Sequence, residues 1–194
     1  MRIETVTGEA LLPHVPSVAR LRSTVFAEWP YLYEGKPEDE ARYLRHYVED
    51  RGAAIILAWD GESIVGAATC QPMVATHGPV KATFEAAGRD PAQHCYFGES
   101  VLLAAYRGQG AGVAFFAARE AHALSLGMSH ATFCAVVRNV NDPRKPADYT
   151  PLDAFWRKRG YTHHPELSCV FDWLEPGDTK KTPHSLSFWI KALS

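Results

Sequence analysis

The segment Tyr106-Arg107-Gly108-Gln109-Gly110-Ala111-Gly112 joins an apolar run to a long amphipathic segment. The run before it, residues 101–105, predicts a buried strand, and apolar residues recur at helical spacing through 113–126 after it. The glycines therefore lie where a strand becomes a helix, and free backbone N–H groups meet the positive end of the helix dipole there. Glycine permits positive φ and a close anion, and Arg107 adds a charge-assisted hydrogen bond. The segment predicts a phosphate-binding loop.

The spacing of these residues narrows the kind of phosphate ligand. No Gly-Lys-Ser/Thr follows, as a nucleotide-triphosphatase loop would need, and the dinucleotide fingerprint needs two residues before its last glycine instead of one. Arg107-x-x-Gly110-x-Gly112 resembles the Arg/Gln-x-x-Gly-x-Gly/Ala signature of the GNAT superfamily of acetyltransferases. For the glycines alone, a plain tight turn is the alternative.

Two flanking segments extend the resemblance to GNAT proteins. Leu102-x-Ala104-x-Tyr106-Arg107-Gly108 is similar to the strand end of the family, with Ala104 where proline is common. Residues 154–161, Ala-Phe-Trp-Arg-Lys-Arg-Gly-Tyr, are similar to its late helix. The two motifs stand in the order of the family with a predicted strand between them. The chain is therefore identified as a member of the superfamily, with its substrate unassigned.

The resemblance implies an α/β fold in a single acetyltransferase domain over residues 1–194. A mixed, mostly antiparallel central sheet of about seven strands would be flanked by about four helices. The fourth and fifth strands of that fold splay apart around the pantetheine arm of the co-substrate, acetyl-coenzyme A (acetyl-CoA), and the glycine loop wraps its pyrophosphate. A bulge near the splay frees N–H groups for the thioester oxygen. The expected cofactor-binding residues are Val101, Leu102, Leu103, Arg107, Gly108, Gln109, Gly110, Ala111, Gly112 and Asn139.

Hydrophobic periodicity and turn residues divide the chain into further elements. Helices are predicted at 13–28, 37–49, 81–87, 113–126 and 152–159, and strands at 2–6, 53–59, 63–70, 95–103, 131–137, 168–173 and 185–191.

Length and composition fit one globular domain, with 194 residues, 46% hydrophobic and 22% charged. A net charge of −2 shows no excess of positive charge that would favour binding to nucleic acid or to an acidic membrane. No apolar run reaches the roughly 20 residues of a membrane span, and no signal peptide is expected. The four cysteines lack Cys-x-x-Cys spacing, and the histidines lack metal-ligand pairing. We therefore expect a cytoplasmic protein with reduced thiols, no metal, no nucleic-acid partner and no membrane association.

Glu99 is the candidate catalytic base. Amines are protonated near neutrality, so acetyl transfer requires a group that takes the proton of the amine. Glu99 lies in the apolar run 96–101, close to the strand end where the resemblance places the thioester. Apolar surroundings raise the pKa of a carboxylic acid. The alternative is a structural carboxylate that pairs with an arginine or caps backbone N–H groups.

The acid for the leaving thiolate is where the chain departs from the family. GNAT proteins commonly use a tyrosine, the second aromatic of the late helix, but that position is Trp156 here. An indole N–H donates a hydrogen bond but is no useful acid. Tyr149, just before that helix, is the candidate that supplies a hydroxyl instead, and its alternative role is to anchor the loop.

Trp29, Tyr31 and Tyr33 are the candidates for binding the acceptor. They share a loop, residues 29–35, that contains proline and glycine, and their rings suit an apolar or aromatic amine or a cation. Packing of this loop onto the core is the alternative.

Direct transfer of an acetyl group from acetyl-CoA to the primary amine of a small molecule is the leading hypothesis. An acyl-CoA-binding module with little turnover, suggested by Trp156, and a protein or peptide N-acetyltransferase are the alternatives. A homodimer is a further prediction, because the aromatic residues of the last strands, Trp173, Phe188 and Trp189, are compatible with a dimer surface and equally with a core.

Overall fold

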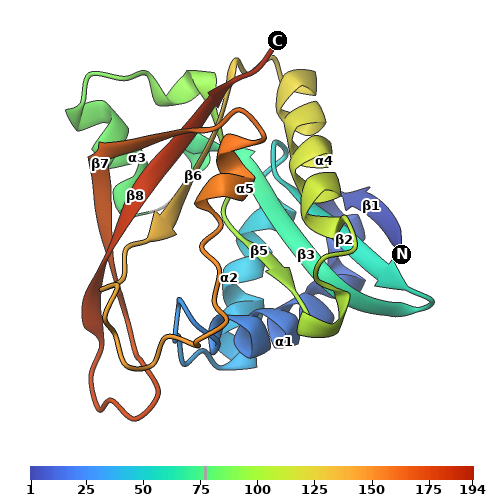
Figure 1. Ribbon diagram of the computed structural model, residues 1–194. Coiled ribbons are helices and arrows are strands. Elements are labelled where there is room, and N and C mark those ends of the chain that lie inside the picture. The colour runs from blue at the N-terminus through green and yellow to red at the C-terminus, as the bar shows by residue number, and fades with distance from the viewer. Residues whose placement is uncertain (77) are drawn as a thin grey trace.

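The computed structural model describes residues 1–76 and 78–194, and these residues form one sheet of eight strands. Its order is β1-β2-β3-β4-β6-β8-β7, and β5 pairs with β3 beyond the end of β4. β4 and β6 are parallel, and the other pairings are antiparallel. Figure 1 shows the sheet curving from β1 at one side to β7 and β8 at the other. The strands are β1 (Arg2–Val6), β2 (Ala54–Asp60), β3 (Ser63–Pro72), β4 (His94–Tyr96), β5 (Ser100–Leu102), β6 (His130–Val136), β7 (Thr162–Trp173) and β8 (Thr182–Ala192).

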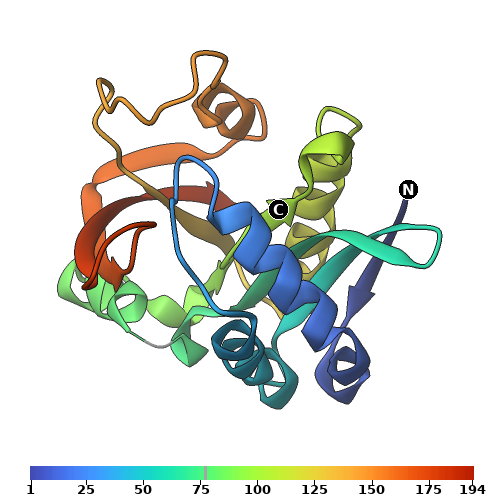
Figure 2. The same ribbon diagram turned by 90° about the horizontal axis from the view of Figure 1, so that it is seen from below.

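Helices cover both faces of the sheet (Figures 1 and 2). The alternation of side chains along β2 assigns them, because successive residues of a strand point to opposite faces. Ile55 packs with residues of α1 and α2, whereas Ile56 packs with Phe115 of α4. The α-helices are α1 (Val15–Phe26), α2 (Pro37–Glu49), α3 (Pro79–Ala86), α4 (Ala111–Ser125) and α5 (Asp153–Arg157), and the 3-10 helices are η1 (Gly8–His14), η2 (Met73–Ala75), η3 (Pro91–Gln93) and η4 (Ala104–Tyr106).

One predicted strand, residues 95–103, is divided into β4 and β5 by a β-bulge. Gln71 of β3 opposes Tyr96, whereas Ala68 opposes Ser100, so four steps along one strand match three along β3. An extra residue of this kind bends a strand and changes the direction of the groups that follow it. The bulge therefore turns β5 away from β6, the strand that pairs with β4.

The α/β fold with a mostly antiparallel mixed sheet is confirmed, with differences in detail. The described residues hold eight strands, because the bulge splits one predicted strand, and five α-helices, of which α3 is the helix predicted over 81–87. The last two strands are longer than the predicted 168–173 and 185–191, since they form one twisted hairpin with an irregularity between His164 and Ser168.

The aromatic residues of the last strands lie in the core. Trp173, Phe188 and Trp189 are at most 7% exposed, so they give no support to a dimer surface. Within residues 1–76 and 78–194, no helix has the length and apolar character needed to cross a membrane.

Candidate functional site

The amino terminus of α4 is open to a ligand. Gly110 is the N-cap residue with φ 89°, and no side chain caps the helix. Gly108 has φ 75°, and a Cβ added at either glycine would meet no atom within 4 Å. Positive φ and free space are both features that glycine supplies. The first-turn N–H groups and the helix dipole therefore face a region that suits a phosphate.

Arg107 reaches across this loop to Glu28, two residues past the end of α1. Its Nε donates to the carbonyl oxygen of Leu102 at 3.2 Å, and its Nη2 donates to Glu28 Oε2 at 2.6 Å. Both side chains of the ion pair are almost half exposed, and pairs of that kind are worth little. The ion pair with Glu28 therefore holds Arg107 only weakly, and the binding of a phosphate by Arg107 stays a prediction.

The remaining loop residues shape the turn. Gln109 Nε2 donates to the carbonyl oxygen of Ala105 at 3.0 Å, and Ala111 is buried. A Cβ on Gly112 would lie 3.1 Å from the Phe155 ring. Gly112 therefore allows α4 to pack against α5, whereas Gly108 and Gly110 are the glycines open to a ligand.

The chain of β4 and β5 separates from β6 just past the bulge. We call the region between β5 and β6 the strand opening. Phe97 still donates its N–H to Thr132 of β6 at 2.8 Å, whereas Leu103 donates to Val65 of β3 at 3.0 Å. Backbone N–H groups alternate in direction along a strand. Those of Val101 and Leu103 thus point to β3, and those of Ser100 and Leu102 point into the strand opening.

Glu99 belongs to a buried network of charges beneath the strand opening. Its Oε1 accepts a short hydrogen bond from Arg22 Nη1 of α1, and Arg22 Nε donates to Glu40 Oε2 of α2 at 2.6 Å. The hydroxyl of Tyr33 donates to the second oxygen of Glu40 at 2.6 Å. Burial, followed by the hydrogen bond to Glu40, raises the pKa of Tyr33. The structural role considered for Glu99 is therefore present, and its role as the base stays a prediction.

The aromatic residues of the 29–35 loop take three different positions. Trp29 packs edge-on against Tyr149, with ring centroids 6.0 Å apart. Tyr31 packs against Phe26 at 4.9 Å, and burial raises the pKa of its hydroxyl. Tyr33 joins the Glu40 network. The three rings therefore do not form one aromatic box, and their role in acceptor binding stays a prediction.

Arg138, in the segment after β6, fastens this loop through its side chain. It donates to the carbonyl oxygens of Pro30 at 2.6 Å and Tyr31 at 2.5 Å, and to Glu175 Oε1 at 2.5 Å. Arg144 pairs with the other oxygen of Glu175. Burial raises the pKa of Glu175, but hydrogen bonds from Arg144 and Arg138 outweigh it and leave that pKa below its ordinary value. Loops 29–35, 138–151 and 174–181 are thus held together.

Tyr149, the candidate acid for the leaving thiolate, contacts Trp29 of the 29–35 loop. Tyr149 is half-buried, and burial, followed by the charge of Asp153, raises its pKa. Trp156 packs against Phe133 and Trp189, with centroids 5.0 Å apart in each case, and so serves as a core side chain. Asn139 is exposed, and its Oδ1 accepts the N–H of Asn141 at 2.9 Å. In this structure it stabilises a turn, and contact with pantetheine stays a prediction.

Several residues of the site were not predicted from the sequence. Their positions on the buried faces of helices could have revealed them. Arg22, Glu40 and Arg119 are charged residues on the buried stripes of α1, α2 and α4. Charged side chains are almost never fully buried without partners, so each of these positions marked a polar contact inside the fold. Ser100 could not be found in this way, because the direction of its backbone N–H depends on the bulge.

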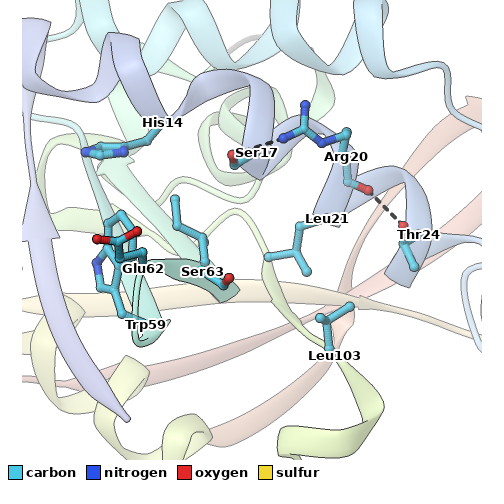
Figure 3. A pocket seen from close by; sticks show the side chains of 10 residues that line it. His14, Ser17, Arg20, Leu21, Thr24, Trp59, Glu62, Ser63 and Leu103 are labelled. Atoms are coloured by element: carbon cyan, nitrogen blue, oxygen red, sulfur yellow. Dashed lines mark hydrogen bonds between the residues drawn. The ribbon is translucent and has the colours of Figure 1, made fainter.

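A cavity of about 490 Å³ lies between α1 and the β2–β3 hairpin (Figure 3). Of the predicted site residues, Leu103 lines it. On its α1 wall, Arg20 donates to Ser17 Oγ at 3.2 Å and accepts a hydrogen bond at its carbonyl oxygen from Thr24 at 2.9 Å. These polar groups satisfy one another, and we assign the cavity no role. In the described part of the chain, no cluster of three or more His, Cys, Asp or Glu could hold a metal ion.

Two strands that separate, with N–H groups between them and an open helix N-terminus beside them, offer hydrogen-bond donors to a carbonyl oxygen and to a phosphate. The model of the acetyltransferase (GNAT) family matches residues 20–161, and the protein belongs to this family. It is an acetyl-CoA-dependent N-acyltransferase. No curated protein matches the chain.

Solved structures share the fold at low sequence identity. A ribosomal-protein-alanine N-acetyltransferase from Brucella melitensis is 15% identical with a TM-score of 0.61, and the match covers 100% of both chains. An N-acetyltransferase from Staphylococcus aureus is 11% identical with a TM-score of 0.61 and the same coverage. The yncA structure from Salmonella typhimurium, solved with its cofactor acetyl-CoA, is 9% identical with a TM-score of 0.60 over 99% of this chain and 94% of that chain. At these identities the likeness shows the fold alone.

Proposed function

We propose that this protein, as one domain over residues 1–194, transfers an acetyl group from acetyl-CoA directly to the primary amine of a small molecule. The observation that carries the proposal is the strand opening, where the N–H groups of Ser100 and Leu102 lie between β5 and β6. The open N-terminus of α4 follows in the chain, and the carboxylate of Glu99 precedes it.

The residues divide the chemistry between them. Acetyl-CoA supplies an activated thioester. The N–H groups of α4 and the guanidinium of Arg107 bind its pyrophosphate. The N–H of Ser100 donates to the thioester oxygen, where negative charge develops as the amine nitrogen forms a bond to the carbonyl carbon, and the N–H of Leu102, two residues further along the strand, is left for the pantetheine arm. The carbon–sulfur bond then breaks with its electron pair on sulfur, and Glu99 accepts the proton of the amine, directly or through water.

The acceptor side favours a small molecule over a protein tail. Arg138 and Glu175 fasten the loops 29–35, 138–151 and 174–181 to one another. A protein substrate requires an extended open groove, whereas a small amine requires only a pocket between such loops. Trp29, Tyr31 and Tyr33 are our candidates for contacting it, and a homodimer remains a prediction.

We place the protein in the cytoplasm. Its four cysteines are free and buried in the described structure, in keeping with a reducing compartment.

Steady-state release of coenzyme A with a panel of acceptors tests the function. The panel holds small primary amines, both aromatic and polycationic, and peptides with free N-termini. A thiol reagent can follow the release, because all four protein thiols are buried. We expect multiple turnovers with at least one small amine and slower reaction with peptides. Turnover confined to peptides would establish the protein acetyltransferase, and binding of acetyl-CoA without turnover on any acceptor would establish the binding module.

A further inference from the structure

Arg119 of α4 is a fully buried cation outside the network of Glu99. It is 2% exposed, and its guanidinium lies 4.4 Å from the centroid of the Phe97 ring and 4.8 Å from that of Phe116. No ion pair joins it to a carboxylate within the described residues. The adjacent Glu120 is engaged by Lys191 and Tyr161. A buried charge without a counter-charge is costly, so its position calls for an explanation.

The hydrogen bonds of Arg119 converge on the β-bulge. Nη1 donates to the carbonyl oxygen of Glu99 at 3.3 Å and lies 3.5 Å from that of Thr69, while Nε donates to Phe115 of its own helix at 3.2 Å. Thr69 and Glu99 are the two residues paired across the bulge, since the N–H of Thr69 also donates to the carbonyl oxygen of Glu99 at 2.9 Å. Arg119 thus holds the point where the strand turns.

The carbonyl group that Arg119 contacts belongs to the same peptide unit as the N–H of Ser100. A peptide unit is planar, and its trans C=O and N–H point in opposite directions. A cation at the oxygen of Glu99 draws electron density along this unit and strengthens the N–H of Ser100 as a donor, as happens in chains of hydrogen bonds at low dielectric. That N–H faces the strand opening.

We propose that Arg119 is a positioning residue for acetyl transfer, which fixes the bulge and polarises the 99–100 peptide so that the Ser100 N–H binds the thioester oxygen more strongly as it becomes negative. The proposal rests on the proposed transfer in the strand opening. It explains why a cation is buried behind the sheet, beyond contact with the amine or the phosphates. A purely structural Arg119 would stabilise the fold and leave the reactivity of bound thioester unchanged.

The test compares Arg119→Met, which removes the charge, and Arg119→Lys, which keeps it but loses the fork of donors. Phe115→Leu is the matched control, because it removes packing contacts of the same helix without removing a charge. Calorimetry measures acetyl-CoA affinity, steady-state kinetics measures kcat and KM, and isotope-edited infrared spectroscopy measures the carbonyl band of bound [1-13C]acetyl-CoA. In the wild type we expect this band at lower wavenumber than in free acetyl-CoA.

For Arg119→Met we expect the band to return toward its position in free acetyl-CoA and kcat to fall about 10- to 100-fold. Deleting an oxyanion donor costs roughly 10²–10³-fold in kcat. The loss for Arg119→Met should be smaller, because the variant keeps the donor, the N–H of Ser100, and only weakens it. Acetyl-CoA affinity and KM for the amine should change by less than about threefold, and Arg119→Lys should recover part of kcat. Phe115→Leu should lower the melting temperature with the band unmoved.

Two results would overturn the proposal. One is a wild-type band that does not move when acetyl-CoA binds, which needs no variant and so holds even if Arg119→Met fails to fold. The other is an Arg119→Met protein that loses stability but keeps the wild-type kcat and band. Failure of the wild type to bind acetyl-CoA would instead refute the proposed cofactor site, and this inference with it.

Discussion

The guanidinium of Arg22 on α1 is hydrogen-bonded to the carboxylate of Glu99, a residue 77 positions later in the chain. Their side chains are 10% and 7% exposed, so the pair is shielded from water. The same guanidinium binds Glu40, and one cation therefore serves two carboxylates. This surplus of negative charge beside the strand opening suits a site that accepts a proton from an amine.

Glu99→Gln tests the base directly. The amide keeps the size of the side chain and an oxygen for Arg22, but it cannot accept the proton. We expect turnover at pH 7 to fall about 10²-fold, the range of a lost general base, with acetyl-CoA affinity little changed. The deficit should narrow from pH 7 to pH 9, because the neutral fraction of an amine with pKa about 10 rises with pH. A deficit equal at both pH values, or none at all, would assign Glu99 to structure.

Arg22→Met tests the buried network as a source of stability. The substitution leaves Glu40 and Glu99 buried without their cation, and breaking a buried pair costs about 3–5 kcal/mol. We expect a loss of this size in urea denaturation at pH 7. A triple variant, Arg22→Met with Glu40→Gln and Glu99→Gln, should recover much of it, because no unpaired charge remains. If the triple variant were as unstable as the single one, packing of Arg22 against Phe26 and Tyr43 would be the main contribution.

The parts of the site that could be predicted from sequence are local. The turn at 107–112 follows one strand and precedes one helix, so its glycines and its position at a helix N-terminus follow from residues within a single segment. Glu99 could be selected for the same reason, since a lone carboxylate in an apolar run is visible without knowledge of the fold.

The rest depends on distant pairings. The bulge exists only relative to β3, because the extra residue appears when Tyr96 and Ser100 are matched to their partners. The N–H direction of Ser100 follows from that register, and so does the contact of Arg119 with Glu99. Likewise, Arg138 meets Pro30 across 108 positions. Periodicity can place a charge on a buried stripe, but the partner of that charge requires the fold.

Gly110→Asp tests the phosphate loop. The position has φ 89° and free space for a side chain, so the fold should tolerate the change at a cost of about 1–2 kcal/mol for the left-handed backbone. The carboxylate would repel the pyrophosphate, and we expect calorimetry to show no binding of coenzyme A. Gly110→Asn is the matched control, with the same size and backbone strain but no charge, and it should bind more tightly than Gly110→Asp. Unchanged affinity in the aspartate variant would place the cofactor elsewhere.

The buried side chain of His94 should make the stability of the folded protein depend on pH. It is 6% exposed, stacks on His130 at 4.7 Å and shares a hydrogen bond with Thr132. Burial, followed by His130, lowers the pKa of His94 to about 4. The unfolded chain, with a pKa near 6.5, therefore binds a proton between pH 6.5 and 4 that the folded protein does not. Stability should fall as pH falls through this window.

The size of this effect is bounded by the pKa difference. An upper limit of about 3 kcal/mol follows from the conversion of pKa to free energy, and solvent screening reduces it to about 1–2 kcal/mol. His94→Asn, which keeps a partner for Thr132, should lose less stability between pH 7 and pH 5 than the wild type in urea denaturation. Parallel losses in the two proteins would show that other groups set the acid response.

Tyr149→Phe tests whether the missing late-helix tyrosine has been replaced. The substitution keeps the ring that packs against Trp29 and removes only the hydroxyl. A coenzyme A thiol resembles cysteine, with a pKa near 8.5, so its thiolate can leave near neutrality without an acid. The hydroxyl is then worth about one neutral hydrogen bond, roughly 1 kcal/mol, and we expect kcat to fall about tenfold or less. Tyr161→Phe, which removes a hydroxyl bound to Glu120, gives the baseline for losing a phenol elsewhere. A thousandfold loss of kcat confined to Tyr149→Phe, with acetyl-CoA binding intact, would show that Tyr149 is an essential acid. Tyr149 would then have taken over the role that a tyrosine at the position of Trp156 has in the family.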